Sequence, residues 1–414
     1  MTKLNRWATV ALTAVLILTG LLVGLGIIEI GLRIAGIEYP AFYVVDEHRG
    51  WVGQPNVSGW YRTEGESYAQ FNSDGFRDGK HTKVKPENTL RIALLGDSMV
   101  EALQVPFSQG FGAITERELS TCPTLAGQKV EVINFGISGY GTAQELITLR
   151  EKVWNYSPDI VLLAFLTLND VIDNSHSLSQ KLEFDQLFSL RPYFIMKNGN
   201  LVFDTTENDR SKNSWWNKNY AKIKSHLRIL QLFNQLRTDF RGLPTVKKST
   251  VRDLQSIGVE ERVKLLSWGH DVYKQPTDPD WQQAWQVTEG LISLMHHEVI
   301  AKGADFTVVT LSGFAPVYPD PSVRQQYMQA FGVTDLFYPE KRITDLGEKS
   351  GFSVLNLGEP FQAYADQNKV CVSGFAKTGL CGGHWNAVGH ELAGKMIASK
   401  LCEKLTSIAS NQVQ

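Results

Sequence analysis

The sequence Arg-Ile-Ala-Leu-Leu-Gly-Asp-Ser, residues 91–98, decides the fold of this chain. Its four consecutive apolar residues, Ile92–Leu95, are followed by a glycine, which is typical of a strand buried on both faces of a parallel sheet. The residues after Ser98 favour a helix, so we expect Ser98 where a strand gives way to a helix. A backbone N–H at such a junction can stabilise an oxyanion, although Asp97 and Ser98 could also serve only as a helix cap.

Strands and helices alternate along the chain after this stretch. Further buried strands are expected at 130–135, 160–166, 305–311 and 352–357, and helices at 142–156, 281–302 and 387–405. This alternation predicts a doubly wound, mainly parallel five-stranded α/β sheet flanked by helices. Ligands of such sheets bind at the carboxyl ends of the strands, which is the position expected for Ser98.

The amino-terminal segment is apolar. Residues 7–28 carry no charge, and at about 1.5 Å per residue they span roughly 33 Å, enough to cross a bilayer. Lys3 and Arg6 precede this run, which predicts a single membrane crossing with the amino terminus in the cytoplasm and the rest outside it, in the periplasm or the extracellular space. A cleaved signal peptide is the alternative, but its apolar region is usually shorter and ends in a small-x-small site.

The composition changes along the chain indicate four regions. We expect a membrane anchor at 1–36, a small β-containing lead-in at 37–89 and an α/β domain at 90–410. Residues 171–280 interrupt the strand–helix alternation and are interpreted as an insertion. An insertion of this length usually covers a site and selects what enters it, although it could also be a structural side-domain.

Charge and cysteine content narrow the possible partners. The net charge of -2 gives no electrostatic reason to expect nucleic acid, and no zinc-type Cys or His spacing occurs, so neither a metal nor a cofactor is predicted. Outside the cytoplasm the four cysteines could form disulfides, Cys371 with Cys381 and Cys122 with Cys402. Other pairings and free thiols remain open.

Four short blocks stand at or beside the expected carboxyl ends of strands. They read Gly-Asp-Ser at 96–98, Asn-Phe-Gly-Ile-Ser-Gly at 134–139, Leu-Asn-Asp at 168–170 and His-Trp-Asn at 384–386, the last followed by Gly389-His390. In this order they resemble the blocks of the SGNH (GDSL-type) hydrolases, a family of esterases, lipases and carbohydrate acyl-hydrolases. The resemblance covers roughly residues 70–405.

The resemblance implies a role for each block. Ser98 would be the nucleophile and His384 the general base that activates it. The backbone N–H groups of Ser98 and Gly139 and the side-chain amide of Asn169 would form the oxyanion hole. Gly139 could alternatively be a turn glycine with positive φ. Ser138 is a rival nucleophile, but its surroundings miss the Gly-x-Ser-x-Gly pattern by one position.

The chain departs from the family pattern at one position. The family usually carries an aspartate three residues before the histidine, and this chain has Cys381 there. A backbone carbonyl or a more distant acid such as Asp366 is therefore expected to orient His384, or the site is weakened. We expect the disulfide between Cys371 and Cys381 to help to hold the histidine in place.

The lead-in sequence Phe-Asn-Ser-Asp-Gly-Phe-Arg, residues 71–77, is similar to that of membrane-anchored bacterial members of the superfamily. Some of these relatives add or remove acyl groups on exported polysaccharides. The leading expectation is therefore an extracytoplasmic serine esterase that hydrolyses acyl or acetyl esters on a glycan through a Ser98 acyl-enzyme. An O-acyltransferase using the same site and a non-catalytic assembly or binding protein are the alternatives. No protein partner is predicted.

Overall fold

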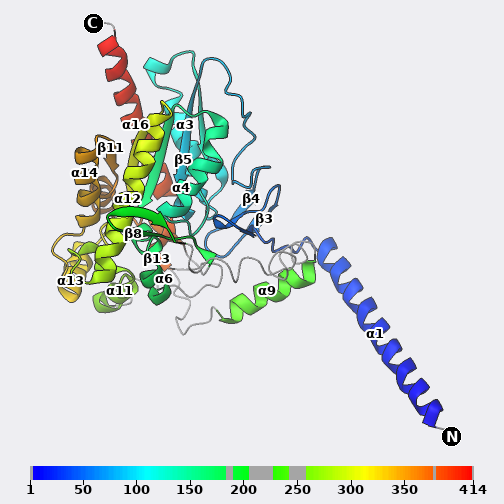
Figure 1. Ribbon diagram of the computed structural model, residues 1–414. Helices are drawn as coiled ribbons and strands as arrows, with labels where there is room; N and C mark the ends of the chain where they lie inside the picture. The colour runs from blue at the N-terminus through cyan, green and yellow to red at the C-terminus, as the bar shows by residue number, and fades with distance from the viewer. Residues whose placement is uncertain (1–2, 183–189, 205–226, 242–257, 376–378, 413–414) are drawn as a thin grey trace.

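The chain is built around a five-stranded sheet, shown in Figure 1. The computed structural model describes residues 3–182, 190–204, 227–241, 258–375 and 379–412. In the spatial order β11-β10-β7-β5-β6, the strands are Ser353–Asn356, Asp305–Leu311, Ile160–Leu166, Thr89–Gly96 and Lys129–Asn134. Each neighbouring pair runs parallel, which confirms the predicted doubly wound parallel sheet.

Helices cover both faces of this sheet. On β5, Ala93 and Leu95 pack into one hydrophobic core, and Ile92 and Leu94 pack into a second core on the opposite face. The first core includes residues of α4 (Thr142–Glu151), α12 (Pro279–Ala301), α13 (Pro321–Phe331) and α14 (Tyr338–Ser350). The second includes residues of α3 (Phe111–Leu119), α15 (Gly358–Asn368) and α16 (Ala387–Gln412). Burial on both faces is what the apolar run in β5 predicts.

All three predicted helices differ from the observed ones at a boundary, and the last, predicted at 387–405, continues to Gln412. The helix expected at 142–156 ends at Glu151 and is followed by a short 3-10 turn, Val153–Tyr156. The helix expected to begin at residue 281 begins at Pro279, because the carboxylate of Asp278 accepts a hydrogen bond from the N–H of Asp280 at 2.8 Å. Proline at the first helical position fits this cap, since its missing N–H needs no partner there.

The lead-in consists of two antiparallel hairpins. They are formed by β1 (Tyr43–Asp46) with β2 (Gly50–Gly53), and by β3 (Ser58–Tyr61) with β4 (Ser67–Gln70). The side chain of Trp51 is fully buried, and its indole N–H donates to the carbonyl of Ser138 at 3.0 Å. Arg77 is also buried and donates to the carbonyl of Val105 at 2.7 Å. These contacts fasten the lead-in to the carboxyl edge of the sheet.

Between β7 and α12 the structure describes several short elements. They are α5 (Asp170–Asp173), α6 (His176–Leu182), β8 (Phe194–Lys197), β9 (Asn200–Phe203), α9 (Arg228–Arg241), α11 (Val259–Leu265) and the 3-10 turn η5 (His270–Tyr273). The sequence predicts a helix near residues 220–240, and α9 corresponds to the described part of that stretch. The tandem tryptophans Trp215 and Trp216 lie outside the described residues.

The amino-terminal helix α1 (Lys3–Ile34) projects away from the α/β domain (Figure 1). Its segment Trp7–Ile34 has a mean hydropathy of 2.5 and is not buried, so it is long and apolar enough to cross a membrane. Its exposed apolar surface is consistent with a membrane anchor.

Both expected cysteine pairs form. Cys122 is bonded to Cys402, with their Cα atoms 5.7 Å apart, and this bond joins the end of α3 to α16. Cys371 is bonded to Cys381, with their Cα atoms 4.8 Å apart. The two disulfides fit a protein that folds in an oxidising compartment.

Candidate active site

Ser98 lies where β5 gives way to a short helix, α2 (Ser98–Glu101). Asp97 caps this helix, since its carboxylate accepts the N–H of Met99 at 2.8 Å. Space at this junction is narrow: a Cβ on Gly96 would stand 2.4 Å from the side chain of Val100. The two interpretations of Asp97 and Ser98, as a helix cap and as the junction between a strand and a helix, are therefore both correct.

His384 reaches Ser98 from the other end of the chain. It lies on β13 (Gly379–Trp385), which pairs with β12 (Ser373–Phe375), and its Nε2 is 2.8 Å from the Oγ of Ser98. Gly382 and Gly383, which precede it, belong to the same strand, and Gly383 has a φ of +72°. The structure therefore brings together the serine and the histidine that the sequence blocks single out.

The carboxylate of Glu64 holds His384 at two points. One oxygen accepts a hydrogen bond from the backbone N–H of His384 at 3.0 Å, and the other contacts Nδ1 of its ring. This fixes the ring so that Nε2 points to Ser98. Serine, histidine and glutamate thus form one continuous chain of hydrogen bonds, which is the arrangement of a catalytic triad.

Glu64 also changes the acid–base behaviour of His384. Burial lowers the pKa of the imidazole, but the hydrogen bond and the charge of Glu64 outweigh burial, and the net pKa lies above its ordinary value. The negative charges of Asp97 and Glu101 act in the same direction. A raised pKa makes the histidine a stronger base toward the serine hydroxyl.

Sequence reasoning missed Glu64 and considered Asp366 instead. The prediction that Asp366 orients His384 is wrong, because the carboxylate of Asp366 forms a bidentate ion pair with Arg324, with both N–O distances at 2.7 Å. Glu64 is separated from His384 by 320 residues. A neighbouring residue, Glu66, has the same side chain on the same hairpin, so no local signal singles out Glu64.

The turn that joins β3 to β4 docks against the residues that follow α2, and this positions Glu64. Gly65 has φ +67°, and a Cβ there would stand 2.2 Å from the carbonyl oxygen of Gln104. The hydroxyl of Ser67 donates to the carbonyl of Leu103 at 2.6 Å. Only glycine permits this approach, and the close fit directs the buried Glu64 side chain at His384.

The other two block residues lie beside Ser98 in the topology. β5 is flanked by β6 and β7, and Gly139 and Asn169 follow these two strands. Gly139 has φ +75°, so it is a positive-φ turn glycine, and its carbonyl accepts from Arg191 at 2.8 Å. Asn169 is half-buried and begins α5. Their roles as oxyanion donors remain a proposal.

The rival serine has a different partner. The hydroxyl of Ser138 donates to the carboxylate of Glu101, and its backbone N–H donates to the same carboxylate at 2.9 Å. Tyr43 donates to this carboxylate as well, at 2.6 Å. Ser138 is thus part of a buried network that fastens the second block to α2.

Three of the blocks follow adjacent parallel strands at one edge of the sheet, and the fourth delivers His384 to the first. The candidate active site of this chain therefore lies at the carboxyl ends of the central strands of the sheet. No protein-family model and no curated protein matches this chain.

Solved structures similar to this chain include a lipase/acylhydrolase from Enterococcus faecalis, with 16% identity, a TM-score of 0.36, and coverage of 76% of this chain and 96% of that one. A GDSL-like lipase from Bacteroides thetaiotaomicron has 14% identity, a TM-score of 0.33 and coverage of 78% and 92%. An acetylxylan esterase from Geobacillus stearothermophilus has 10% identity, a TM-score of 0.35 and coverage of 77% and 96%. The roles of individual residues rest on the contacts within this chain.

Buried carboxyl groups surround the candidate active site. Burial raises the pKa of Asp97 to about 6, against the opposing effects of the hydrogen bond from Met99 and the charge of His384. Burial, together with repulsion from neighbouring carboxylates that include Asp97, raises the pKa of Glu145 and of Asp170 well above the ordinary range. Within the described residues, no three His, Cys, Asp or Glu side chains are grouped so that they could hold a metal ion.

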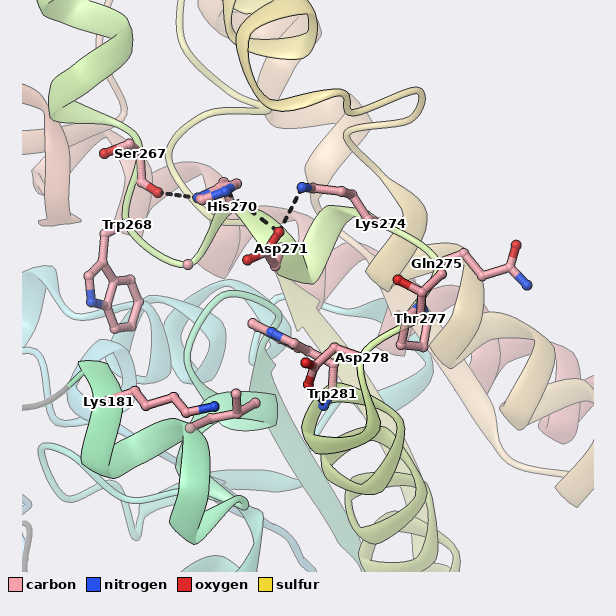
Figure 2. A pocket seen from close by; sticks show the side chains of 13 residues that line it. Lys181, Ser267, Trp268, His270, Asp271, Lys274, Gln275, Thr277, Asp278 and Trp281 are labelled. Atoms are coloured by element: carbon pink, nitrogen blue, oxygen red, sulfur yellow. Dashed lines mark hydrogen bonds and ion pairs between the residues drawn. The ribbon is translucent and has the colours of Figure 1, made fainter.

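A cavity of about 450 Å³ lies beside the third block, and Figure 2 shows the residues that line it. Gly269, in its wall, packs so tightly on Leu168 that a Cβ would stand 2.8 Å from the leucine side chain. The indole of Trp268 stands at one side of the cavity, and Asp271 forms an ion pair with Lys274 at 2.7 Å (Figure 2). The cavity thus offers an aromatic face and several charged groups.

Proposed function

We propose that this protein is an SGNH-type serine esterase that cleaves carboxylic esters through an acyl-enzyme on Ser98. The observation that carries the proposal is the contact between Ser98 Oγ and His384 Nε2 at 2.8 Å, with Nδ1 of the histidine held by Glu64. A serine hydroxyl is a weak nucleophile until a neighbouring base removes its proton. The three side chains supply the nucleophile, the base and the group that orients the base.

The proposed reaction has two steps. In the first, His384 takes the proton of Ser98 as Oγ attacks the ester carbonyl, and then gives this proton to the departing alcohol. The glutamate stabilises the imidazolium that exists between these two transfers. In the second step, water attacks the acyl group with His384 again as the base, which releases the acid and restores Ser98.

Three donors are proposed for the oxyanion that develops in each step. They are the N–H of Ser98, the N–H of Gly139 and the side-chain amide of Asn169. The placement of Ser98 as the first residue of α2 supports the first of these, because the N–H groups of a helix start have no partner within the helix. Gly139 follows β6 and Asn169 follows β7, the strands on either side of β5, and these positions beside Ser98 support their roles as the other two donors.

A glycan ester is the proposed substrate class, and the proposed location is outside the cytoplasm. The cavity beside Leu168 supports a glycan substrate, since an aromatic face beside charged groups suits a sugar ring with its hydroxyls. The apolar helix α1 and the two disulfides support a location outside the cytoplasm, with α1 as an anchor whose amino terminus is cytoplasmic. With Glu64 beside His384, the missing acid at position 381 no longer favours a non-catalytic protein.

The test is hydrolysis of a short-chain aryl ester by the full-length protein in detergent, compared with Ser98→Ala. The variant should lose at least about 10³ in kcat, as expected when the nucleophile is removed. Equal rates in the two proteins would disprove the proposal. Ser138→Ala is the matched control, since its hydroxyl contacts Glu101. Product analysis with a sugar acceptor present would separate hydrolysis from O-acyl transfer.

A further inference from the structure

Helix α9 (Arg228–Arg241) begins against the last turns of α1. The carboxylate of Glu29 accepts the backbone N–H groups of Arg228 and Ile229, each at 3.0 Å. The guanidinium of Arg228 also pairs with Glu38 at 2.8 Å. From this point α9 runs away from the end of α1 rather than along it, as Figure 1 shows. The start of α9 is therefore fixed at the level of Glu29.

The polar face of α9 is the face that contacts the rest of the protein. Gln231 is 2% exposed, and its side-chain oxygen accepts the N–H of Tyr39 at 3.1 Å. Asn234 and Gln235, three and four residues further along, line a hollow that Trp60 of β3 also lines. Residues at this spacing share one side of a helix. The helix is thus attached to the lead-in through amides.

The apolar face of α9 points away from the protein. Phe233 is 64% exposed and Leu236 is 45% exposed, and Leu227, just before the helix, is 41% exposed. An amphipathic helix on a water-soluble surface normally turns its apolar side to the core and its polar side outward. In α9 the two sides are reversed, so this face needs an apolar environment from outside the chain.

The position of Glu29 identifies that environment. The uncharged run 7–28 is about as long as the hydrocarbon core is thick, so Glu29, the first charged residue after it, falls at the membrane–water interface. Because Glu29 binds the start of α9, the helix begins at the depth of the lipid headgroups. Arg237 is exposed on the same helix and is suited to lipid phosphates.

We propose that α9 is an interfacial helix that lies in the membrane surface, with Phe233 and Leu236 inserted among the lipid chains. This inference rests on the proposed anchor α1 and extends the membrane contact from one crossing helix to a second helix. α9 is also attached to the lead-in, whose second hairpin contains Glu64. The membrane surface thereby sets the height and orientation of the catalytic edge of the sheet.

The test uses single-cysteine labelling of the full-length protein in phosphatidylcholine–phosphatidylglycerol vesicles. All four natural cysteines are in disulfides, so Phe233→Cys introduces the one reactive thiol for an environment-sensitive dye. Lipids that carry a quencher on the acyl chain should lower the fluorescence about twofold or more, and aqueous iodide should have little effect. Leu236→Cys, on the same face, gives an independent position if Phe233→Cys folds poorly.

Two control positions separate the possible outcomes. Val84→Cys, 83% exposed and apolar but near the amino edge of the sheet, should be quenched by iodide alone. Val23→Cys reports on α1 itself. Lipid quenching at position 23 with only iodide quenching at 233 and 236 would overturn the inference while leaving the anchor intact. Iodide quenching at all positions would overturn both, and ester hydrolysis by the same samples reports on the proposed activity separately.

Discussion

The carboxylate of Glu64 and the imidazole of His384 are in contact although 320 residues separate them in the sequence, and the same carboxylate binds the backbone N–H of the histidine at 3.0 Å. The acid of this triad therefore comes from a hairpin before the α/β domain. It contacts the histidine ring where the sequence resemblance would place an aspartate, three residues before the histidine, and where this chain has Cys381.

Replacing Glu64 by glutamine should lower kcat by about 10²–10⁴ with little change in KM, because the histidine loses the charge that fixes its tautomer and stabilises its protonated form. Steady-state hydrolysis of an aryl acetate measures this effect. Glu66→Gln is the matched control, since Glu66 is exposed on the same turn. Similar kinetics in both variants would show that Glu64 plays no part in turnover.

The pH dependence should reflect the same pair. The pKa of His384 is raised, and the histidine acts as a base only when it is unprotonated, so kcat/KM should fall as the pH drops through a value above 6.5. Glu64→Gln removes the main group that raises this pKa. The acid limb of the profile should therefore shift to lower pH in the variant. A limb that stays in place would mean that another group controls it.

Replacing Asn169 by alanine should lower kcat by about 10²–10³ without a comparable change in KM, as expected for the loss of one oxyanion donor. Asn169 also begins α5, so a loss of stability could imitate this result. Asn169→Asp keeps the shape of the side chain, which makes no capping hydrogen bond to α5 that the change could remove, but an ionised aspartate cannot donate a hydrogen bond. Its thermal stability should match the wild type while its kcat falls, and wild-type activity in this variant would remove Asn169 from the oxyanion hole.

The two disulfides should differ in what they stabilise. Loop closure predicts a loss of about 3 kcal/mol for the Cys371→Ser/Cys381→Ser variant and about 5 kcal/mol for Cys122→Ser/Cys402→Ser, whose closed loops span 10 and 280 residues. Activity should follow the opposite order, because Cys381 lies three residues before His384. Denaturant unfolding and aryl acetate turnover measure the two effects. Unchanged turnover in the first variant would mean that Glu64 alone holds the histidine.

Trp268→Ala should affect sugar substrates selectively. If a glycan occupies the cavity beside Leu168, the variant should lose about tenfold in kcat/KM on an acetylated oligosaccharide, equivalent to about 1.4 kcal/mol, and keep its rate on an aryl acetate. Trp60→Ala, an exposed tryptophan outside this cavity, is the control. Equal effects of Trp268→Ala on both substrates would contradict a sugar subsite.

The sequence was most informative where structure depends on local pattern. The run Ile92–Leu95 predicted a strand buried on both faces, and the glycines and helix formers around it predicted the position of Ser98. The acid beside His384 could not be found in this way, because its position depends on how the β3–β4 turn docks on Gln104. Gly382 and Gly383 illustrate the same limit: they lie between Leu380 and Trp385, the residues of β13 that pair with β12, in an irregular part of the pairing that the local sequence does not predict.

The wide separation of the three side chains also fixes when activity can begin. A ribosome adds Glu64 first, Ser98 soon afterwards, and His384 only 286 residues after the serine. A chain interrupted anywhere before residue 384 lacks its base, however well its sheet has formed. During synthesis the nascent chain thus cannot form the proposed acyl-enzyme until β13 has been made and His384 has reached Ser98 and Glu64.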